Sequence, residues 1–282
     1  MTDRKILPDV TASSPEELIS LAGRAAVVIG GAQGIGFAVA RRYAQAGARV
    51  LVADLRGEAA AAAAAKLGEE VGGTVESGQV DIASSDSVEA LADAAVERLG
   101  GLDIWANFAA LYPIRVADMH PALDFPDADW QRTIDTNLGG AFYGSRAAAR
   151  RMVAAGKAGV IINTMSTLVD RFAGHPGMVA YAASKGGIEQ LTKVLAAEWG
   201  PNGIRVLALK PTVVSTEGLD EHRALLTEHL DRDPFGELEA MMPLGRFGVP
   251  DDLARLALVA ASDLGLWLTG SVIVGDGGEL SV

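Results

Sequence analysis

The amino-acid sequence predicts an α/β fold, a doubly wound parallel sheet of about seven strands with helices on both faces. Short apolar runs alternate with helical segments along nearly the whole chain. Several runs, such as the "AAVVIG" of residues 25–30, are apolar almost throughout, which is typical of parallel strands covered on both faces. We expect strands at residues 25–30, 49–54, 74–80, 102–106, 160–164, 205–209 and 271–274. We expect helices at residues 35–46, 58–68, 84–99, 127–155, 181–199 and 251–262.

Composition limits the classes of function. The 282 residues are 49% hydrophobic and 21% charged, enough for one large domain with a sizeable core. The net charge of −12 argues against nucleic acid or an anionic membrane as a partner. Cysteine is absent, which excludes a thiolate nucleophile or a cysteine metal site. The N-terminus has no apolar signal region and no long uncharged apolar stretch follows, so we expect a cytoplasmic protein.

A glycine-rich turn follows the first expected strand and opens the first expected helix, within "VVIGGAQGIGFAVARRYAQAG". Glycines at 30, 34 and 36 let the backbone turn tightly and approach a pyrophosphate, which the free N–H groups of the helix N-terminus would bind. The turn indicates a Rossmann-type dinucleotide site.

The second expected strand ends at Asp54, where a carboxylate can accept hydrogen bonds from an adenosine ribose. A carboxylate there repels a 2′-phosphate, so NAD is favoured as cofactor and NADP is less favoured. Arg56, two residues further on, leaves NADP open.

Tyr181 and Lys185 stand four residues apart in the expected helix 181–199 and therefore share one face. A nearby cation stabilises a phenolate and lowers its pKa, so this pair can exchange a proton with a substrate hydroxyl.

Taken together, these features resemble the short-chain dehydrogenase/reductases in their single-domain, NAD(P)-dependent branch, over about residues 21–278. The resemblance includes "GGAQGIG", Asp54, "VDIA", "DTNLGG", "INTMST", "YAASK", "PTVVST" and "PLGRFGVPDDLA", in that order. It implies a single dinucleotide-binding and catalytic domain over 21–282, with a substrate lid at about 213–245. Before it, residues 1–20 form a tail with a short helix, which a capping box at Ser14 to Glu17 predicts.

The resemblance also implies roles for individual residues. Tyr181 is expected to be the acid/base and Lys185 to lower its pKa and bind the nicotinamide ribose. Ser166 should orient the substrate oxygen, although the stretch from Ser166 to Tyr181 is long enough that Thr167 could replace it. Asn137 should hold a water in the proton relay. The cofactor contacts implied are Gly30, Gln33, Gly34, Ile35, Gly36, Asp54, Leu55, Asp81, Ile82, Asn107, Ala109, Tyr181, Lys185, Pro211, Val214 and Thr216.

Several positions depart from the family's pattern, among them Thr212, which stands where the later motif usually has glycine after Pro211. Ile29 replaces a threonine ahead of the glycine turn, and Phe108 and Ala110 change the usual Asn-Asn-Ala-Gly after the fourth strand. These changes affect the seat of the cofactor and leave the proton-handling residues intact.

Apolar side chains from three variable segments are expected to form the substrate site, which suits a small apolar alcohol or ketone. The expected substrate contacts are Leu111, Leu168, Phe172, Met178, Val213 and Leu219. No metal site is expected: His222 and His229 share a helix face, but a metal site would need further ligands, and solvated surface histidines are the more common case. The small residues 182, 183, 186 and 187 favour close helix approach, and the resemblance implies a homotetramer or homodimer.

The sequence thus predicts an NAD-dependent oxidoreductase that interconverts a secondary alcohol and its ketone. Two alternatives stay open: an NADPH-linked carbonyl reductase, and a non-catalytic dinucleotide-binding sensor or scaffold.

Overall fold

The computed structural model describes residues 7–112, 120–171, 177–230 and 233–281. Its strands form one sheet of seven parallel strands in the order β3-β2-β1-β4-β5-β6-β7. The strands are β1 (Ala25–Ile29), β2 (Arg49–Asp54), β3 (Val75–Gln79), β4 (Ile104–Asn107), β5 (Gly159–Thr164), β6 (Ile204–Pro211) and β7 (Val272–Gly275). All seven expected strands and the doubly wound fold are therefore confirmed.

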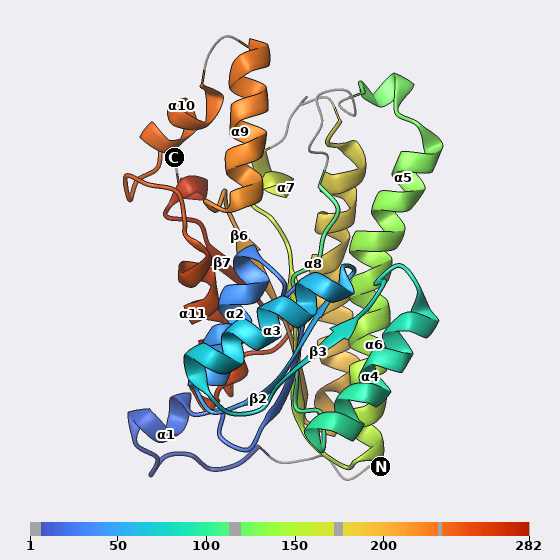
Figure 1. Cartoon of the computed structure of the whole chain (residues 1–282), viewed down its shortest axis with the longest axis vertical. Coiled ribbons are helices and arrows are strands. Elements are labelled where there is room, and N and C mark those ends of the chain that lie inside the picture. Colours follow the sequence, from blue (N-terminus) through green and yellow to red (C-terminus); the bar gives the residue numbers. More distant parts are fainter. Residues whose placement is uncertain (1–6, 113–119, 172–176, 231–232, 282) are drawn as a thin grey trace.

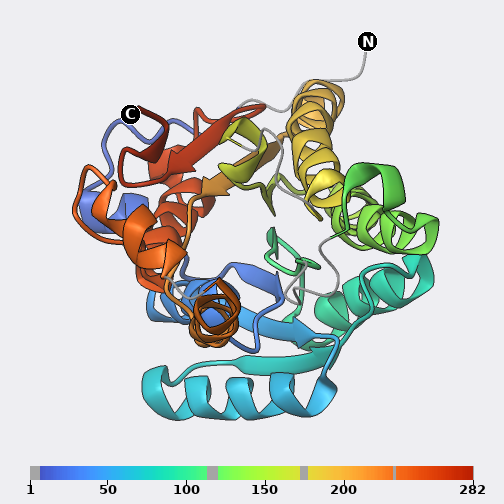
Figure 2. The same cartoon turned by 90° about the horizontal axis from the view of Figure 1, so that it is seen from above.

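Helices cover both faces of the sheet, as the view from above shows (Figure 2). The helices are α1 (Pro15–Ile19), α2 (Gly34–Gln45), α3 (Gly57–Val71), α4 (Ser85–Leu99), α5 (Asp127–Ile134), α6 (Gly140–Ala154), α7 (Leu168–Arg171), α8 (Val179–Trp199), α9 (Glu217–Leu230), α10 (Pro234–Ala240) and α11 (Pro250–Ala261). Figure 1 labels each of them, with α9 and α10 standing above the sheet.

The core consists of two large clusters, one on each face of the sheet. Alternate residues of β1 supply both: Ala26 and Val28 pack with α2, α3 and α11, whereas Val27 and Ile29 pack with α4, α6 and α8. Each strand in the middle of the sheet is therefore buried on both sides, which explains why its sequence is apolar almost throughout. Ile29 is one of these core residues and is almost fully buried.

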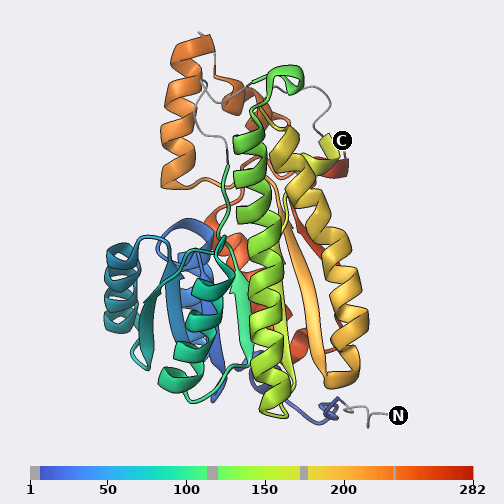
Figure 3. The same ribbon diagram turned by 90° about the vertical axis from the view of Figure 1, so that its right-hand side faces the viewer.

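Two sequence predictions about helices need comment. The capping box at Ser14 is confirmed: its hydroxyl accepts from the Glu17 amide at 3.3 Å, and the Glu17 carboxylate accepts from the Ser14 amide at 2.7 Å. The expected single helix 127–155 is continuous but contains a π-helical segment, η3 (Asp135–Gly139), between α5 and α6. Figure 3 shows α5 and α6 as one long column beside α8.

Candidate functional site

The glycine turn between β1 and α2 requires glycine at three positions. Gly30 and Gly34 have φ of +72° and +56°, in the region that side chains disfavour. A Cβ on Gly36 would lie 2.1 Å from the Gly30 carbonyl oxygen, and one on Gly30 would lie 2.6 Å from the Ala109 amide nitrogen. Gln33, the N-cap of α2, makes no side-chain capping bond, so the first amides of the helix are not capped by it. Close backbone approach and uncapped helical N–H groups fit a pyrophosphate.

The acidic end of β2 lies beside this turn. Asp54 has a side chain that is only 13% exposed, and its carboxylate accepts from the Arg56 amide at 3.2 Å. The Arg56 guanidinium donates to the Gln33 side-chain oxygen at 2.8 Å and lies 3.6 Å from the Asp54 carboxylate. Leu55 is 62% exposed. The structure therefore places a cation, as well as the predicted carboxylate, next to Gln33.

The carboxyl ends of β3 and β4 lie at the same edge of the sheet. The Asp81 carboxylate accepts from the Ala83 amide at 2.9 Å, and Ile82 is buried against Gly140. Asn107, the last residue of β4, is buried, and its side-chain oxygen has no partner among the described residues. Phe108, which replaces an amide side chain, packs partly buried against the core.

The segment after β6 meets the glycine turn from the other side. A Cβ on Gly34 would lie 3.4 Å from the Thr216 methyl carbon, so these two positions are neighbours. Val214 forms an isolated parallel bridge to Gly248, and the Thr216 hydroxyl accepts from the Leu219 amide at 3.2 Å. Pro211, at the end of β6, accepts from the Thr167 amide at 2.9 Å. The predicted cofactor contacts that follow β1, β2, β3 and β4, and those at the end of β6 and after it, thus form one row at the carboxyl ends of the parallel strands.

Tyr181 and Ser166 come together although they are fifteen positions apart in the sequence. Their hydroxyls share a hydrogen bond, and both side chains are buried. Thr167, the alternative to Ser166, is fully buried and its hydroxyl has no partner among the described residues. The Tyr112 ring packs against the Tyr181 ring edge to face, with centroids 5.0 Å apart and planes at 87°.

Burial dominates the acid–base properties of Tyr181 and Lys185. It raises the pKa of the Tyr181 phenol above its ordinary value; the Ser166 hydrogen bond opposes that rise and Tyr112 adds to it. Burial also lowers the pKa of the Lys185 ammonium to about 7. Burial thus sets the net direction of the Tyr181 pKa in the folded chain, and the lowering by Lys185 stays a prediction.

Lys185 lies one helical turn from Tyr181 and is 2% exposed. Its Nζ donates to the Thr164 carbonyl oxygen at 2.6 Å and lies 5.9 Å from the centre of the Tyr181 ring. The lysine is thus fixed by the end of β5, at the same strand end that leads to Ser166.

Asn137 lies in the π-helical segment and is buried. Its carboxamide accepts from the Leu111 amide at 2.7 Å and donates to the Leu111 carbonyl at 3.0 Å and to the Ser184 hydroxyl at 3.1 Å. Ser184 in turn donates to the Tyr181 carbonyl at 2.7 Å. The side chain therefore joins the loop after β4 to α8, and its role in holding a water stays a prediction.

The expected substrate contacts come from several segments of the chain. Leu111 is held by Asn137; the amide of Leu168 donates to the Ser166 hydroxyl at 3.2 Å. Met178 is buried just before α8, and Val213 is half-buried after β6. Leu219 lies in α9, and Phe172 falls outside the described residues.

Sequence reasoning did not identify one cluster of charges near Ser166. Asp170 and Arg171 of α7 form ion pairs with Lys210 of β6 and with the buried Glu279. A lysine inside the otherwise apolar "IRVLALKP" of β6 is the sequence signal that could have indicated it. In the described ranges, this cluster included, no group of three or more His, Asp or Glu side chains is placed to hold a metal ion. None of the described helices is both long and apolar enough to cross a membrane.

Comparison with known proteins agrees with this arrangement. The family model described as "Enoyl-(Acyl carrier protein) reductase" matches residues 30–279. D-threitol dehydrogenase of Mycolicibacterium smegmatis is 40% identical over 92% of this chain and 93% of its own length. 3beta-hydroxysteroid dehydrogenase 1 of Eggerthella lenta is 36% identical, over 92% and 94%.

Among solved structures, a gluconate 5-dehydrogenase from Burkholderia cenocepacia, in complex with NADP and tartrate, superposes with a TM-score of 0.83. It is 32% identical and covers 95% of this chain and 100% of its own. With the parallel sheet and the row of strand ends described above, these matches show that the chain belongs to the short-chain dehydrogenase/reductase family of oxidoreductases.

Proposed function

We propose that this protein interconverts a secondary alcohol and its ketone, with NAD as cofactor and Tyr181 as the acid/base. The observation that carries the proposal is the buried hydrogen bond between the Tyr181 phenol and the Ser166 hydroxyl. The Ser166 hydroxyl would orient the substrate oxygen, and the Tyr181 hydroxyl would transfer the proton. Both lie beside the row of strand ends that fits a dinucleotide.

The chain's own residues would bind and manage the proton. The glycine turn would hold the pyrophosphate, Asp54 the adenosine ribose, and Lys185 the nicotinamide ribose; the nicotinamide would supply or accept the hydride. Ser166 would donate to the substrate oxygen and fix its position. Because burial raises the pKa of Tyr181, the phenol is protonated near neutral pH and is ready to donate to the oxygen of a ketone. In the opposite direction the phenolate would need the positive charge of Lys185 to form.

The walls favour an apolar substrate. Leu111, Leu168, Val213 and Leu219 are half-buried aliphatic side chains, Met178 is a buried one, and Tyr112 adds an aromatic edge. The names of the two relatives cover a polyol and a hydroxysteroid, so the decisive substrate panel contains both classes beside simple secondary alcohols. Production of NADH, followed by its absorbance, identifies the substrate class.

The acid/base assignment predicts the effect of one oxygen atom. Tyr181→Phe removes the phenolic hydroxyl but keeps the ring that packs on Tyr112. Turnover should fall by roughly 10²-fold or more, because general acid–base catalysis contributes at least that much. Cofactor binding, measured by quenching of tryptophan fluorescence, should stay within about twofold. Unchanged turnover would contradict the assignment, whereas cofactor binding by wild-type protein that turns over no alcohol or ketone would favour a dinucleotide-binding sensor.

An NADPH-linked carbonyl reductase is the second candidate. Arg56 favours it, because its guanidinium already lies against Gln33, next to the position expected for the adenosine ribose. The gluconate 5-dehydrogenase in complex with NADP supports the same candidate. Initial rates with both cofactors at equal concentration separate the two.

We also infer an assembly of two or four chains. Two observations support it: Gly186 of α8 faces open space, and Val194 on the same helix is 59% exposed. A second helix could approach closely along such a surface.

A further inference from the structure

The hydroxyl of Ser166 is tied directly to the short helix that follows it. Ser166 Oγ accepts from the Leu168 amide at 3.2 Å, and the Ser166 carbonyl accepts from the Val169 amide at 3.4 Å. The Thr167 amide donates to Pro211 at 2.9 Å, which fixes the start of the segment to β6. Any displacement of α7 would therefore move Ser166 relative to Tyr181.

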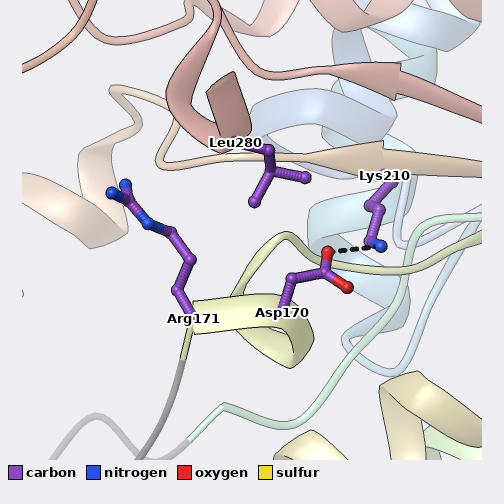
Figure 4. A pocket seen from close by; sticks show the side chains of 4 residues that line it. All are labelled: Asp170, Arg171, Lys210 and Leu280. Carbon is purple, nitrogen blue, oxygen red and sulfur yellow. Dashed lines mark ion pairs between the residues drawn. The ribbon is translucent and has the colours of Figure 1, made fainter. Parts of the chain in front are cut away.

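Four charged residues hold the other end of α7, and we name them the α7 ion-pair cluster: Asp170, Arg171, Lys210 and Glu279. Lys210 Nζ forms an ion pair with the Asp170 carboxylate, and Arg171 Nη1 lies 3.2 Å from Glu279 Oε1. Figure 4 shows Asp170 and Arg171 projecting from α7 on either side of Leu280, with Lys210 reaching Asp170 from β6. Asp170, Arg171, Lys210 and Leu280 line a cavity of about 560 Å³.

Two members of this cluster are buried, so breaking its ion pairs costs more than breaking ion pairs at the surface. The side chains of Lys210 and Glu279 are 9% and 3% exposed. A buried charge without a partner is strongly unfavourable, whereas an exposed one is not. A different position of α7 would leave an ammonium from the sheet and a carboxylate from η6 (Glu279–Ser281) without their counter-charges. The observed placement of α7 gives each of these two groups a counter-charge.

We propose that the α7 ion-pair cluster positions Ser166, so that Lys210 and Glu279 are positioning residues for the substrate oxygen. The inference rests on the proposed function, in which Ser166 binds that oxygen. Lys210 and Glu279 act through α7 and touch neither substrate nor cofactor. The cluster should consequently affect catalysis and substrate binding more than dinucleotide binding, because the contacts expected for the pyrophosphate and the adenosine follow β1 and β2, on the other side of the sheet's strand order from β6.

The test compares Glu279→Gln and Lys210→Met with a control, Asp263→Asn. The control removes a partly buried ion pair of the same kind, Arg24–Asp263, whose side chains are 28% and 24% exposed and which joins the start of β1 to η5 (Asp263–Gly265). Both cluster variants should lower kcat by about tenfold and raise the KM for substrate, since small displacements of a reacting group cost that much or more. The Kd for the cofactor should not change, and Asp263→Asn should leave both kinetic constants unchanged.

A double-mutant cycle tests whether Arg171 and Glu279 act on catalysis through one shared interaction. Arg171→Gln and Glu279→Gln together should lower kcat no further than either change alone, because both remove the same interaction. Independent, additive losses, or wild-type kinetics in folded Glu279→Gln and Lys210→Met, would overturn the inference.

Hydrogen exchange gives a readout that needs no turnover. Peptides covering residues 165–171 should take up deuterium faster in Glu279→Gln than in the wild type, and at the wild-type rate in Asp263→Asn. Equal uptake in Glu279→Gln would contradict the inference even if no substrate is found. Wild-type protein without turnover on any alcohol or ketone, but with faster exchange in Glu279→Gln, would contradict the proposed function and leave the positioning of α7 supported.

Discussion

Lys185 carries an ammonium into the interior, where only the Thr164 carbonyl receives its hydrogen bond among the interactions described for it. Burial lowers its pKa to about 7 from an ordinary value of 10.5. Near neutral pH the side chain therefore exists in both protonation states. This property would let small changes in its surroundings, including a bound dinucleotide, alter the charge beside Tyr181.

The lowered pKa has a consequence for stability. Between about pH 7 and the ordinary pKa of 10.5, the unfolded chain binds a proton at Lys185 that the folded chain does not. The contribution of Lys185 to stability should therefore rise with pH across that window, by at most about 1.4 kcal/mol per pH unit. Urea unfolding at about pH 7.5 and about pH 9 should show this rise in the wild type and not in Lys185→Met. Lys193→Met, on the exposed side of α8, is the control and should keep the rise.

Asp54 and Arg56 favour different cofactors: the Asp54 carboxylate favours NAD, and the Arg56 guanidinium favours NADP. Asp54→Ala removes the carboxylate that would repel a 2′-phosphate and leaves the Arg56 guanidinium in place. The ratio of kcat/KM for NAD to that for NADP should fall by at least about tenfold. Arg56→Ala is the matched variant and should raise the ratio. Preference for NADP in the unaltered protein would show that Asp54 does not select the cofactor.

For individual residues, the sequence predicted where side chains lie better than it predicted their pKa values. The meeting of Gly34 with Thr216 could be predicted because these residues follow β1 and β6, and the carboxyl ends of parallel strands lie together. The meeting of Ser166 with Tyr181 is predicted from the family resemblance, since both residues follow the same strand, β5. The direction of the Tyr181 pKa could not be predicted, because it depends on how deeply the phenol is buried. The catalytic and cofactor roles themselves stay predictions.

Among the elements, the helices show where sequence periodicity is insufficient. Residues 127–155 predict one helix, and the chain is helical throughout, but the π-helical segment η3 depends on backbone bonds that no apolar pattern indicates. Residues 217–242, interpreted as part of a lid, contain α9 and α10. The strands were easier to predict, because burial on both faces leaves an apolar run. The division into a tail of residues 1–20 and one domain over 21–282 also stays a prediction.

Glycines within helices provide a test of packing. Gly68 of α3 has nothing within 4 Å of an added Cβ, whereas a Cβ on Gly187 of α8 would lie 2.9 Å from a Leu138 methyl carbon. Gly68→Ala should therefore stabilise the protein by roughly 0.5–1 kcal/mol. Gly187→Ala should gain less or lose stability, since Leu138 must move. Thermal unfolding of both variants measures the difference, and an equal gain at both positions would contradict the packing described for α8.

At the scale of the whole molecule, the exposed surfaces of α8 and β7 are where we expect another chain to bind. β7 is the last strand of the sheet, and its Val274 is 47% exposed. The unpaired backbone groups of an exposed edge strand are a template for pairing with another chain. Sedimentation equilibrium should give the mass of two or four chains. Gly186→Trp, which places a large side chain on the open face of α8, should reduce that mass, whereas Gly68→Ala should not. A single-chain mass for the unaltered protein would exclude the proposed assembly.

Every strand in the sheet pairs only in parallel, and β1 pairs with β4 through Ala26 and Ile104, far apart in the sequence. No two strands can therefore meet as a local hairpin, and each pairing must wait for a long crossover to close. Renaturation from urea should be slow for a chain of this size. While it proceeds, the apolar strands face other chains in the same condition, so recovery of native protein should fall as its concentration rises.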